Sequence, residues 1–431
     1  MPELTRTLTR LNATAMVAGT IIGASIFVQP SEIARHLDSP GAIMLAWAVC
    51  GTLTLFGAFV CAELASAFPV TGGLYVFLRD TFSPLTGFLW GWAMFWTMHS
   101  GIVAAIAVVF ARYAAFFIPV GDIGVRAIAV TAILALSALN YVGVRAGSRV
   151  QTALTCAKLA AIAGIVIAGL TLPHAPVTVA AAAAPVAGGT REFLLALVAG
   201  LFAYGGWHMV TYTAGETTMP ARTIPFALLA GVAIVTAAYV ALNLVYLRVL
   251  PLDAVRSSTR IAADAADAIA GRGGSAFLAA LVMMSSIGGL TGIVLTGPRV
   301  YFSMAEDRLA PAWLGRVHPR YRTPSNAIIA QAVWASVLAA SGAYRQLFTR
   351  VIYTEWLFFA LMAAGLFVLR RRADYSPAFR VPFYRVVTVI FITASLAIVV
   401  NQFASEPRDA ALGLGFVLAG VPVYYLRHAH H

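Results

Sequence analysis

Charged residues are scarce in this sequence. Asp, Glu, Lys and Arg make up 11% of its 431 residues, whereas hydrophobic residues make up 60%. A soluble domain carries about 25% charged residues, so this composition excludes a soluble globular protein and indicates a polytopic membrane protein. The net charge of +12 does not indicate a nucleic-acid-binding protein, because the basic residues fall between apolar segments and not in one patch.

Cysteine is also rare, and the three residues Cys50, Cys61 and Cys156 all lie in apolar runs. This excludes a disulfide framework, and we expect three small buried hydrophobic side chains. The sequence contains no nucleophile elbow, no phosphate-binding loop and no metal-ligand spacing. It therefore gives no reason to expect an enzyme, a cofactor or a metal site.

Hydrophobic runs long enough to span a bilayer recur along the whole chain. Because a spanning helix needs about 20 apolar residues, the sequence predicts an all-α membrane protein with twelve transmembrane helices. Short helices are expected within 71–83 and 253–271, and a loop at 173–190. The predicted spans are 12–36, 41–68, 84–117, 125–143, 149–172, 191–214, 223–250, 273–304, 323–342, 345–370, 383–403 and 409–426.

Arginines are more frequent in the loops on the side of both termini, and the densest cluster is Arg370, Arg371 and Arg372. Cytoplasmic loops carry the excess of basic residues in membrane proteins. We therefore expect a multi-pass protein of the inner (plasma) membrane with its N- and C-termini in the cytoplasm.

Two predicted spans have glycine and small polar residues at their centres: GTIIGASIF at 19–27 in the first and LFAYGGW at 201–207 in the sixth. Lipid cannot satisfy the backbone groups that such a break releases, so breaks persist where the backbone lines a cavity or contacts a ligand. A matching pair of broken helices indicates the binding site of a secondary transporter. The alternative is two glycine-containing faces for helix packing.

The two breaks lie five spans apart, which divides ten spans into five plus five. An odd number of spans per half gives the halves opposite topology, as in an inverted repeat. The predicted division is a first repeat at 1–172, a second at 191–370 and two further helices at 383–426. This symmetry rests on the breaks alone, because the halves share no evident sequence identity.

The broken helices offer groups for both ends of a zwitterionic amino acid. The N-terminal end of a half-helix carries about half a positive charge and suits a carboxylate, whereas a C-terminal end offers carbonyls that suit an ammonium. The residues predicted to bind the substrate carboxylate are Ile21, Gly23, Ala24 and Ser25. The residues predicted to bind the substrate amino group are Phe202, Ala203 and Gly205.

Further motifs accompany the breaks in order along the chain. They are AEL at 62–64, GG-x-Y at 72–75, AGE at 214–216, PR at 298–299, DRLAP at 307–311, HPR at 318–320 and EWLF at 355–358. Together with the two breaks, this set resembles the L-amino-acid transporter (LAT) branch of the amino acid–polyamine–organocation (APC) superfamily over essentially the whole chain.

The resemblance implies a LeuT-type fold with discontinuous helices 1 and 6, alternating access, and amino acid exchange or uptake without sodium. It implies that Phe202 is an aromatic gate and that Thr291 lines the side-chain pocket. Three residues at the second break, Tyr204, Trp207 and His208, are expected in the gate and pocket with them. Animal members of this branch pair with a heavy chain through a cysteine in an outer loop. Because the three cysteines here lie in spans, no disulfide-linked heavy chain is expected.

One position departs from the family pattern, which has Gly-Ser-Gly where this chain has Gly23-Ala24-Ser25. A side chain replaces a glycine and the hydroxyl moves by one position. This predicts a narrower site for small substrates such as alanine, serine or glycine.

The only lysine of the chain, Lys158, lies in the middle of the fifth span. A charge at that depth costs at least ~2.5 kcal/mol and indicates a functional site; the alternative is a lysine that snorkels or caps carbonyls. The resemblance implies that its ammonium stands where sodium-coupled relatives bind an ion, and that it tethers the fifth span to carbonyls near Ile22 and Gly23.

Four other ionisable residues have roles that the sequence suggests. His208 could sense protons or contact substrate, or could equally be a packed histidine. Glu355 needs a partner in the tenth span, as a proton carrier or in a structural ion pair. Glu63 and Glu216 are expected to anchor gates or loops.

The sequence thus predicts sodium-independent transport, by exchange, of small neutral L-amino acids across the lipid bilayer. Proton-coupled uptake of an amino acid or of a polyamine or other amine is the alternative within transport. A membrane-embedded enzyme or receptor is the alternative from another class, but the chain shows neither a catalytic constellation nor a soluble signalling domain.

Overall fold

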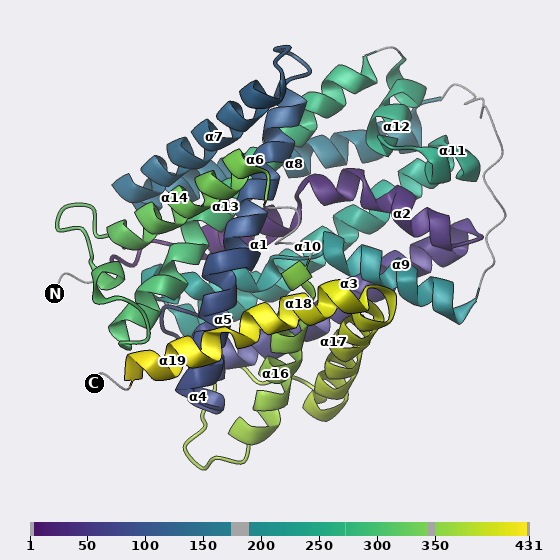
Figure 1. Ribbon diagram of the computed structural model, residues 1–431. Helices are drawn as coiled ribbons and strands as arrows, with labels where there is room; N and C mark the ends of the chain where they lie inside the picture. Colours follow the sequence, from purple (N-terminus) through teal and green to yellow (C-terminus); the bar gives the residue numbers. More distant parts are fainter. Residues whose placement is uncertain (1–3, 174–188, 272, 344–349, 429–431) are drawn as a thin grey trace.

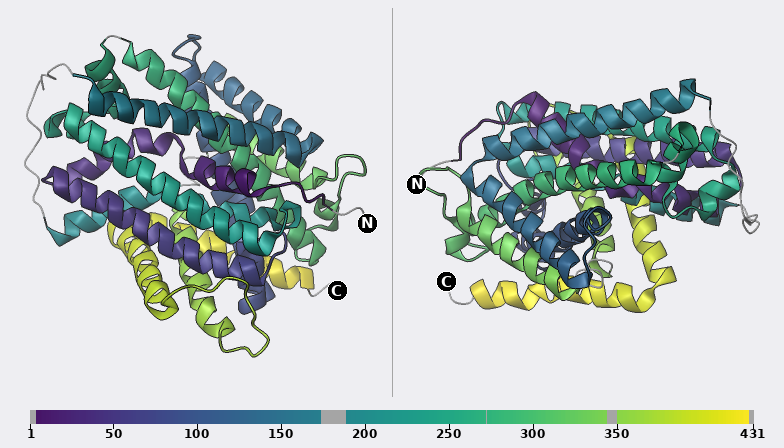
Figure 2. Two further views of the ribbon diagram at one scale, coloured as in Figure 1. Left: turned by 180° about the vertical axis from the view of Figure 1, so that it is seen from behind. Right: turned by 90° about the horizontal axis from the view of Figure 1, so that it is seen from above.

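The computed structural model describes residues 4–173, 189–271, 273–343 and 350–428. These residues form a bundle of helices that run side by side, and both termini lie at the same end of the bundle (Figures 1 and 2). Within the described ranges, the only extended pairing is an isolated bridge between Leu8 and Thr217. The expectation of an all-α protein is therefore confirmed.

Nine helices in the described part of the chain are long and apolar enough to cross a membrane. Two shorter apolar helices of 17 residues each, α14 (Ser325–Ser341) and α16 (Tyr353–Leu369), follow the eighth predicted span. The nine long segments are α3 (Pro40–Ala67), α5 to α6 (Pro84–Ala114), α7 (Asp122–Val142), α8 (Val144–Thr171), α9 to η3 (Thr190–Glu216), α10 (Pro220–Val249), α13 (Gly274–Glu306), α17 (Tyr384–Ser405) and α18 to α19 (Pro407–Leu426).

Both predicted helix breaks are present. The first predicted span consists of α1 (Arg10–Ile21), a 3-10 turn η1 (Ala24–Phe27) and α2 (Gln29–His36), and the backbone at Gly23 is extended. In the sixth span, α9 (Thr190–Ala203) ends before Gly206, and a 3-10 segment η3 (Trp207–Glu216) follows. The chain thus has the helices of a multi-pass membrane protein, and two of its predicted spans are interrupted.

Gly206 shows why the second break requires glycine. Its φ is +95°, a left-handed conformation that other residues adopt only with strain. A Cβ there would also lie 3.2 Å from the carbonyl oxygen of Thr20. The Thr20 hydroxyl also donates to the Gly206 carbonyl at 3.1 Å, so the two breaks contact each other directly.

The third predicted span contains a π-helical turn, η2 (Met94–Met98), between α5 (Pro84–Ala93) and α6 (His99–Ala114). Short helices occur where they were expected: α4 (Leu74–Thr81), α11 (Leu252–Ser257) and α12 (Ile261–Ala270). Most of the loop predicted at 173–190 lies outside the described residues.

The three cysteines were expected to be buried. Cys50 and Cys61 are buried, but Cys156 is exposed on α8, so the expectation was wrong for one of the three.

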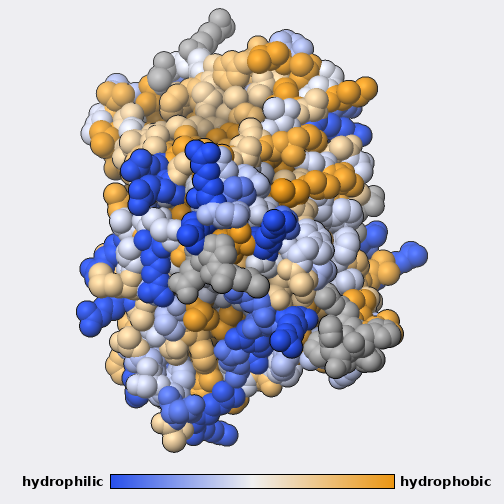
Figure 3. All heavy atoms as spheres, turned by 90° about the vertical axis from the view of Figure 1, so that its left-hand side faces the viewer, coloured by the Kyte–Doolittle hydropathy of each residue, from blue (hydrophilic) through white to orange (hydrophobic). Residues whose placement is uncertain are grey.

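Packing places the first break at the centre of the bundle. α1 packs against α10, α8 and α13, while α17 packs on α16 and α3 at the edge. Groups of hydrophilic residues gather on the face that carries both termini (Figure 3). We call this the terminal face. Because α1 begins there, η1 and α2 lie farther from this face.

Candidate functional site

A cavity of about 390 Å³ lies between the two helix breaks. The structure brings together on its wall every residue predicted for the two ends of the substrate. From the first break these are Ile21, Gly23, Ala24 and Ser25, and from the second Phe202, Ala203 and Gly205. The two sets are almost 180 positions apart in sequence, and the cavity makes them neighbours.

The remainder of the wall is mostly apolar. α6 contributes Ile102, Ile106 and Val109, and the π turn η2 contributes Met94 and Met98. These residues could not be predicted from the sequence, because an apolar side chain on a spanning helix gives no sign of whether it faces lipid, a neighbouring helix or a cavity.

Several lining residues lie farther from the terminal face than the breaks. They include Val28 and Gln29 after the first break, Tyr113 near the end of α6, and Phe202 near the end of α9. Phe202 is 48% exposed, which suits a side chain at an opening. This placement indicates access from the side opposite the termini.

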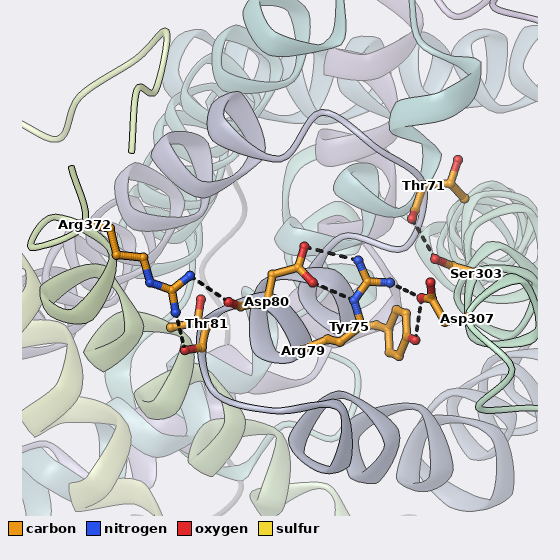
Figure 4. Close-up of polar contacts among 8 residues, drawn as sticks. All are labelled: Thr71, Tyr75, Arg79, Asp80, Thr81, Ser303, Asp307 and Arg372. Carbon is orange, nitrogen blue, oxygen red and sulfur yellow. Dashed lines mark hydrogen bonds and ion pairs between the residues drawn. The ribbon is translucent and has the colours of Figure 1, made fainter. Parts of the chain in front are cut away.

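A polar network closes the terminal face (Figure 4). The Tyr75 hydroxyl of α4 donates to Asp307, just past α13, at 2.7 Å, and Arg79 pairs with the same carboxylate. Ser303 of α13 donates to the Thr71 carbonyl at 2.9 Å. Together these contacts tie α4 and the preceding loop to the end of α13.

Burial, and then the hydrogen bond to Asp307, raise the pKa of Tyr75 above its ordinary value. The hydroxyl therefore keeps its proton across the physiological pH range and stays a donor to the Asp307 carboxylate. A second, more polar cavity of about 600 Å³ lies outside this network and is lined by Arg79, Ser303 and Asp307 among others. The terminal face thus has a vestibule, with the network at its base.

Arg372, after α16, extends the closure to a third element. It donates to the backbone carbonyls of Asp80 and Thr81, each at 3.0 Å (Figure 4). Its role is thus to hold the end of α4.

Glu63 and Glu216 both act as anchors near this face. Glu63 accepts from Arg370 at 2.8 Å and from the Val381 backbone at 2.6 Å. Glu216 pairs with Arg299 at 2.7 and 2.9 Å, and both of these side chains are fully buried. Each pair joins segments that are distant in sequence.

The ammonium of Lys158 is fully buried and donates to three backbone carbonyls. These belong to Gly19 at 3.1 Å, Ile22 at 2.7 Å and Ser285 at 3.2 Å. The contact expected at Ile22 is present, whereas the Gly23 carbonyl is replaced by that of Gly19. Lys158 therefore links α8 to the first break and to α13.

A tyrosine that the sequence did not single out connects the two breaks. The Tyr239 hydroxyl of α10 lies 3.1 Å from the Ile21 carbonyl and 3.2 Å from the Ala203 carbonyl. These are the last residues of α1 and α9, so the one hydroxyl hydrogen is shared between carbonyls at both helix ends. Its position within an apolar run gave no signal in the sequence.

His208 and Glu355 both line the cavity and face each other. His208 Nε2 lies 3.4 Å from Glu355 Oε1, and the ring of His208 packs edge-on against Phe359 and Trp90. The predicted need of Glu355 for a partner is thus met by His208. His99 also reaches the cavity wall, and its Nε2 contacts the Ile293 carbonyl at 2.8 Å.

Three residues predicted for the gate or pocket do not belong to the described lining of this cavity. Tyr204 and Trp207 are buried behind it, against Trp47 and Phe359 respectively. Thr291 is fully buried, and its hydroxyl donates to Ile287 of its own helix at 2.7 Å. Their packing makes Tyr204 and Trp207 supports of the second break in this conformation.

Comparison with known proteins relates the chain to one family over nearly its full length. The model of the amino acid permease family matches residues 8–425. The serine/threonine exchanger SteT of Bacillus subtilis (strain 168) is 31% identical, over 96% of this chain and 95% of its own. The human cystine/glutamate transporter is 30% identical over 98% and 85%, and the human b(0,+)-type amino acid transporter 1 is 30% identical over 98% and 88%.

Proposed function

This chain belongs to the amino acid permease family, and from that premise we propose that it exchanges small neutral L-amino acids across the membrane without sodium. The observation that carries the proposal is the cavity between two broken helices, with helix ends on opposite walls. It is a membrane transporter and not an enzyme.

The proposed architecture is a LeuT-type fold with twelve spans. The nine long segments, the two 17-residue helices and the broken first segment together account for twelve. The proposed repeats are 1–172 and 191–370, followed by 383–426. In support, each repeat begins with a helix that is interrupted near its middle.

The substrate would lie with its carboxylate toward Gly23, Ala24 and Ser25, where η1 begins and leads into α2. Its ammonium would lie toward the carbonyls at the end of α9. The Ala203 carbonyl accepts from Tyr239 and has a second lone pair for the substrate. Ala24 and Ser25 add side chains at the carboxylate end, which supports a preference for small amino acids.

Sodium independence would follow from Lys158. Backbone carbonyls are suitable ligands for a small hard cation, and here those of Gly19, Ile22 and Ser285 converge on the ammonium. The fixed positive charge would then hold the first break in shape without a bound ion.

We propose that the terminal face is cytoplasmic, in line with the arginine-rich segment 370–372 near it. The structure then corresponds to an outward-facing state, open opposite the termini and closed at the network of Figure 4. We propose no disulfide-linked partner, because Cys50 and Cys61 are buried and Cys156 lies within α8.

Flux in proteoliposomes tests the proposal. Vesicles loaded with unlabelled alanine should take up labelled alanine and serine faster than leucine or arginine, at the same rate with sodium or choline outside. Uptake independent of internal amino acid would contradict exchange. Uptake only under an imposed proton gradient would favour proton-coupled transport, for which the His208–Glu355 pair is the candidate site, and flux of amines alone would favour the amine alternative.

Asp307→Asn is expected to weaken closure of the terminal face, because it removes the charge contacted by Arg79 and Tyr75. Arg79 and Asp307 are 22% and 32% exposed, so we expect a shift of about threefold in the outward-facing population. The measurement uses a cysteine introduced as Ser25→Cys in a background lacking Cys156. An impermeant thiol reagent applied on the side opposite the termini should label this cysteine about threefold more slowly when Asp307→Asn is present.

Asp80→Asn is the matched control for this gate. It removes only the contact between Arg79 and its neighbour in the same helix, and it leaves the backbone carbonyl that Arg372 uses. Labelling of Ser25→Cys should therefore stay at its original rate. A slowdown of the same size in both variants would contradict the gate.

A further inference from the structure

Beyond the two helix breaks the described cavity wall is mostly apolar, and a polar pair, His208 and Glu355, lies on its α16 side. His208 and Glu355 lie there among Met94, Met98 and Met209. Polar groups inside an apolar pocket are few, and they determine which ligand atoms are accepted. The pair is therefore the feature of the cavity that could distinguish one side chain from another.

The hydrogen-bonding capacity of this pair is largely unused. His208 is fully buried, and neither of its ring nitrogens makes a hydrogen bond with a described residue; its approach to Glu355 is an ion-pair distance of 3.4 Å. The side chain of Glu355 is 16% exposed, toward the cavity. Buried polar groups normally find partners, so a pair left with spare acceptors beside a cavity indicates a missing ligand atom.

The neighbouring His99 is tied to another helix through one ring nitrogen, and its Nδ1 makes no hydrogen bond with a described residue. Its Nε2 is already occupied by the Ile293 carbonyl at 2.8 Å, across to α13. Lys158, the other buried charge near the breaks, uses its ammonium on three carbonyls. Of the ionisable groups on the described wall, Glu355 is therefore the one whose oxygens face the cavity and are partly exposed to it.

The position of the pair suits a substrate side chain. His208 comes two residues after Gly206, at the end of the second break, and Glu355 faces it from α16. A substrate held by its carboxylate and ammonium between the breaks would direct its side chain away from both backbone segments, into the space that this pair borders.

We propose that His208 and Glu355 form a hydrogen-bonding subsite that selects amino acids with a hydroxyl group on the side chain. The hydroxyl would donate to a Glu355 oxygen that faces the cavity, beside His208 Nε2 at 3.4 Å. The proposal rests on the proposed function and specifies its substrate class: serine and threonine over alanine and valine.

A hydroxyl fits this subsite better than a cationic group does. The thioether and aliphatic walls of Met94, Met98 and Ile102 cannot replace the hydration of an ammonium or guanidinium. A hydroxyl needs one acceptor, and the rest of the substrate side chain can remain in apolar surroundings.

Threonine and valine provide the test, because they have nearly the same shape and differ by a hydroxyl in place of a methyl group. In proteoliposomes loaded with serine, threonine should inhibit uptake of labelled serine at about a tenfold lower concentration than valine, since a site built for a hydroxyl rejects an analogue that leaves its polar groups unpaired. In Glu355→Leu the threonine-to-valine ratio should fall to about one, with valine still exchanged.

The chain offers a matched control in a second His–Glu pair. His36 and Glu192 lie 2.8 Å apart, away from the described lining of the cavity. Glu192→Leu removes the same kind of side chain from a His–Glu pair elsewhere, and the threonine-to-valine ratio should not change. Glu355→Gln, which keeps an acceptor of the same shape, should retain a ratio above one even if Glu355→Leu fails to fold.

The outcomes separate the two proposals. Equal inhibition by threonine and valine in an actively exchanging wild type would overturn the subsite and leave the exchange function standing. A preference for ornithine or arginine would overturn the hydroxyl assignment in favour of a cationic side chain. No exchange of any neutral amino acid by the wild type would instead contradict the proposed function itself.

Discussion

Replacing Lys158 with methionine is expected to reduce exchange by between about tenfold and a hundredfold, because the carbonyls of Gly19, Ile22 and Ser285 would lose a charged donor. Hydrogen bonds from charged groups contribute about 1.5–3 kcal/mol each. The first break would then lose the arrangement that binds the substrate carboxylate. Initial rates of alanine exchange in proteoliposomes measure this effect.

Methionine is chosen because it preserves the length of the lysine side chain beside Gly288, which leaves little space around the Lys158 Cε and Nζ. Yield and elution profile in detergent should stay near those of the wild type. Lys158→Arg keeps the charge in a larger, planar group and should recover part of the rate. Exchange at the wild-type rate in Lys158→Met would show that the contacts cap the carbonyls and do nothing more.

The second large effect is expected at Glu216, and it concerns stability. Glu216→Leu would leave the Arg299 guanidinium fully buried without its counter-charge. Removing one partner of a buried ion pair costs about 3–5 kcal/mol. We therefore expect a large drop in the melting temperature of the purified protein in detergent, together with a lower yield.

Two variants check that the cause is the stranded charge. The double variant Glu216→Leu/Arg299→Met should regain much of the lost stability, because apolar residues replace the whole pair. Glu32→Leu breaks a pair with Arg35 whose side chains are both more than 40% exposed, and it should change stability by about 1 kcal/mol or less. A double variant no more stable than Glu216→Leu would contradict the argument.

The helix breaks could be predicted because glycine carries a strong local signal. A spanning helix that contains Gly23 or the pair Gly205-Gly206 at its centre must satisfy released backbone groups, and the structure interrupts both helices there. The residues predicted at the two ends of the substrate belong to those same short segments. Predicting the breaks therefore also predicted these residues of the cavity wall.

Contacts between helices were harder to predict. His208 and Glu355 were each recognised as unusual, but their proximity depends on how α16 is rotated against η3, and no residue near either one encodes that. The π turn at Met94–Met98 likewise changes which side chains of the third span face inward. Thr291 was expected in the pocket, yet it lies inside the packing of α13.

The burial of Lys158 also has a practical consequence. It is the only lysine in the sequence, and its side chain is fully buried. An amine-reactive dye has no other side-chain amine to modify, and this one is inaccessible while α8 stays packed against α1. Modification of Lys158 would therefore report the separation of these two helices. The rate of acylation, followed by peptide mass analysis, would measure how often they separate at the centre of the bundle.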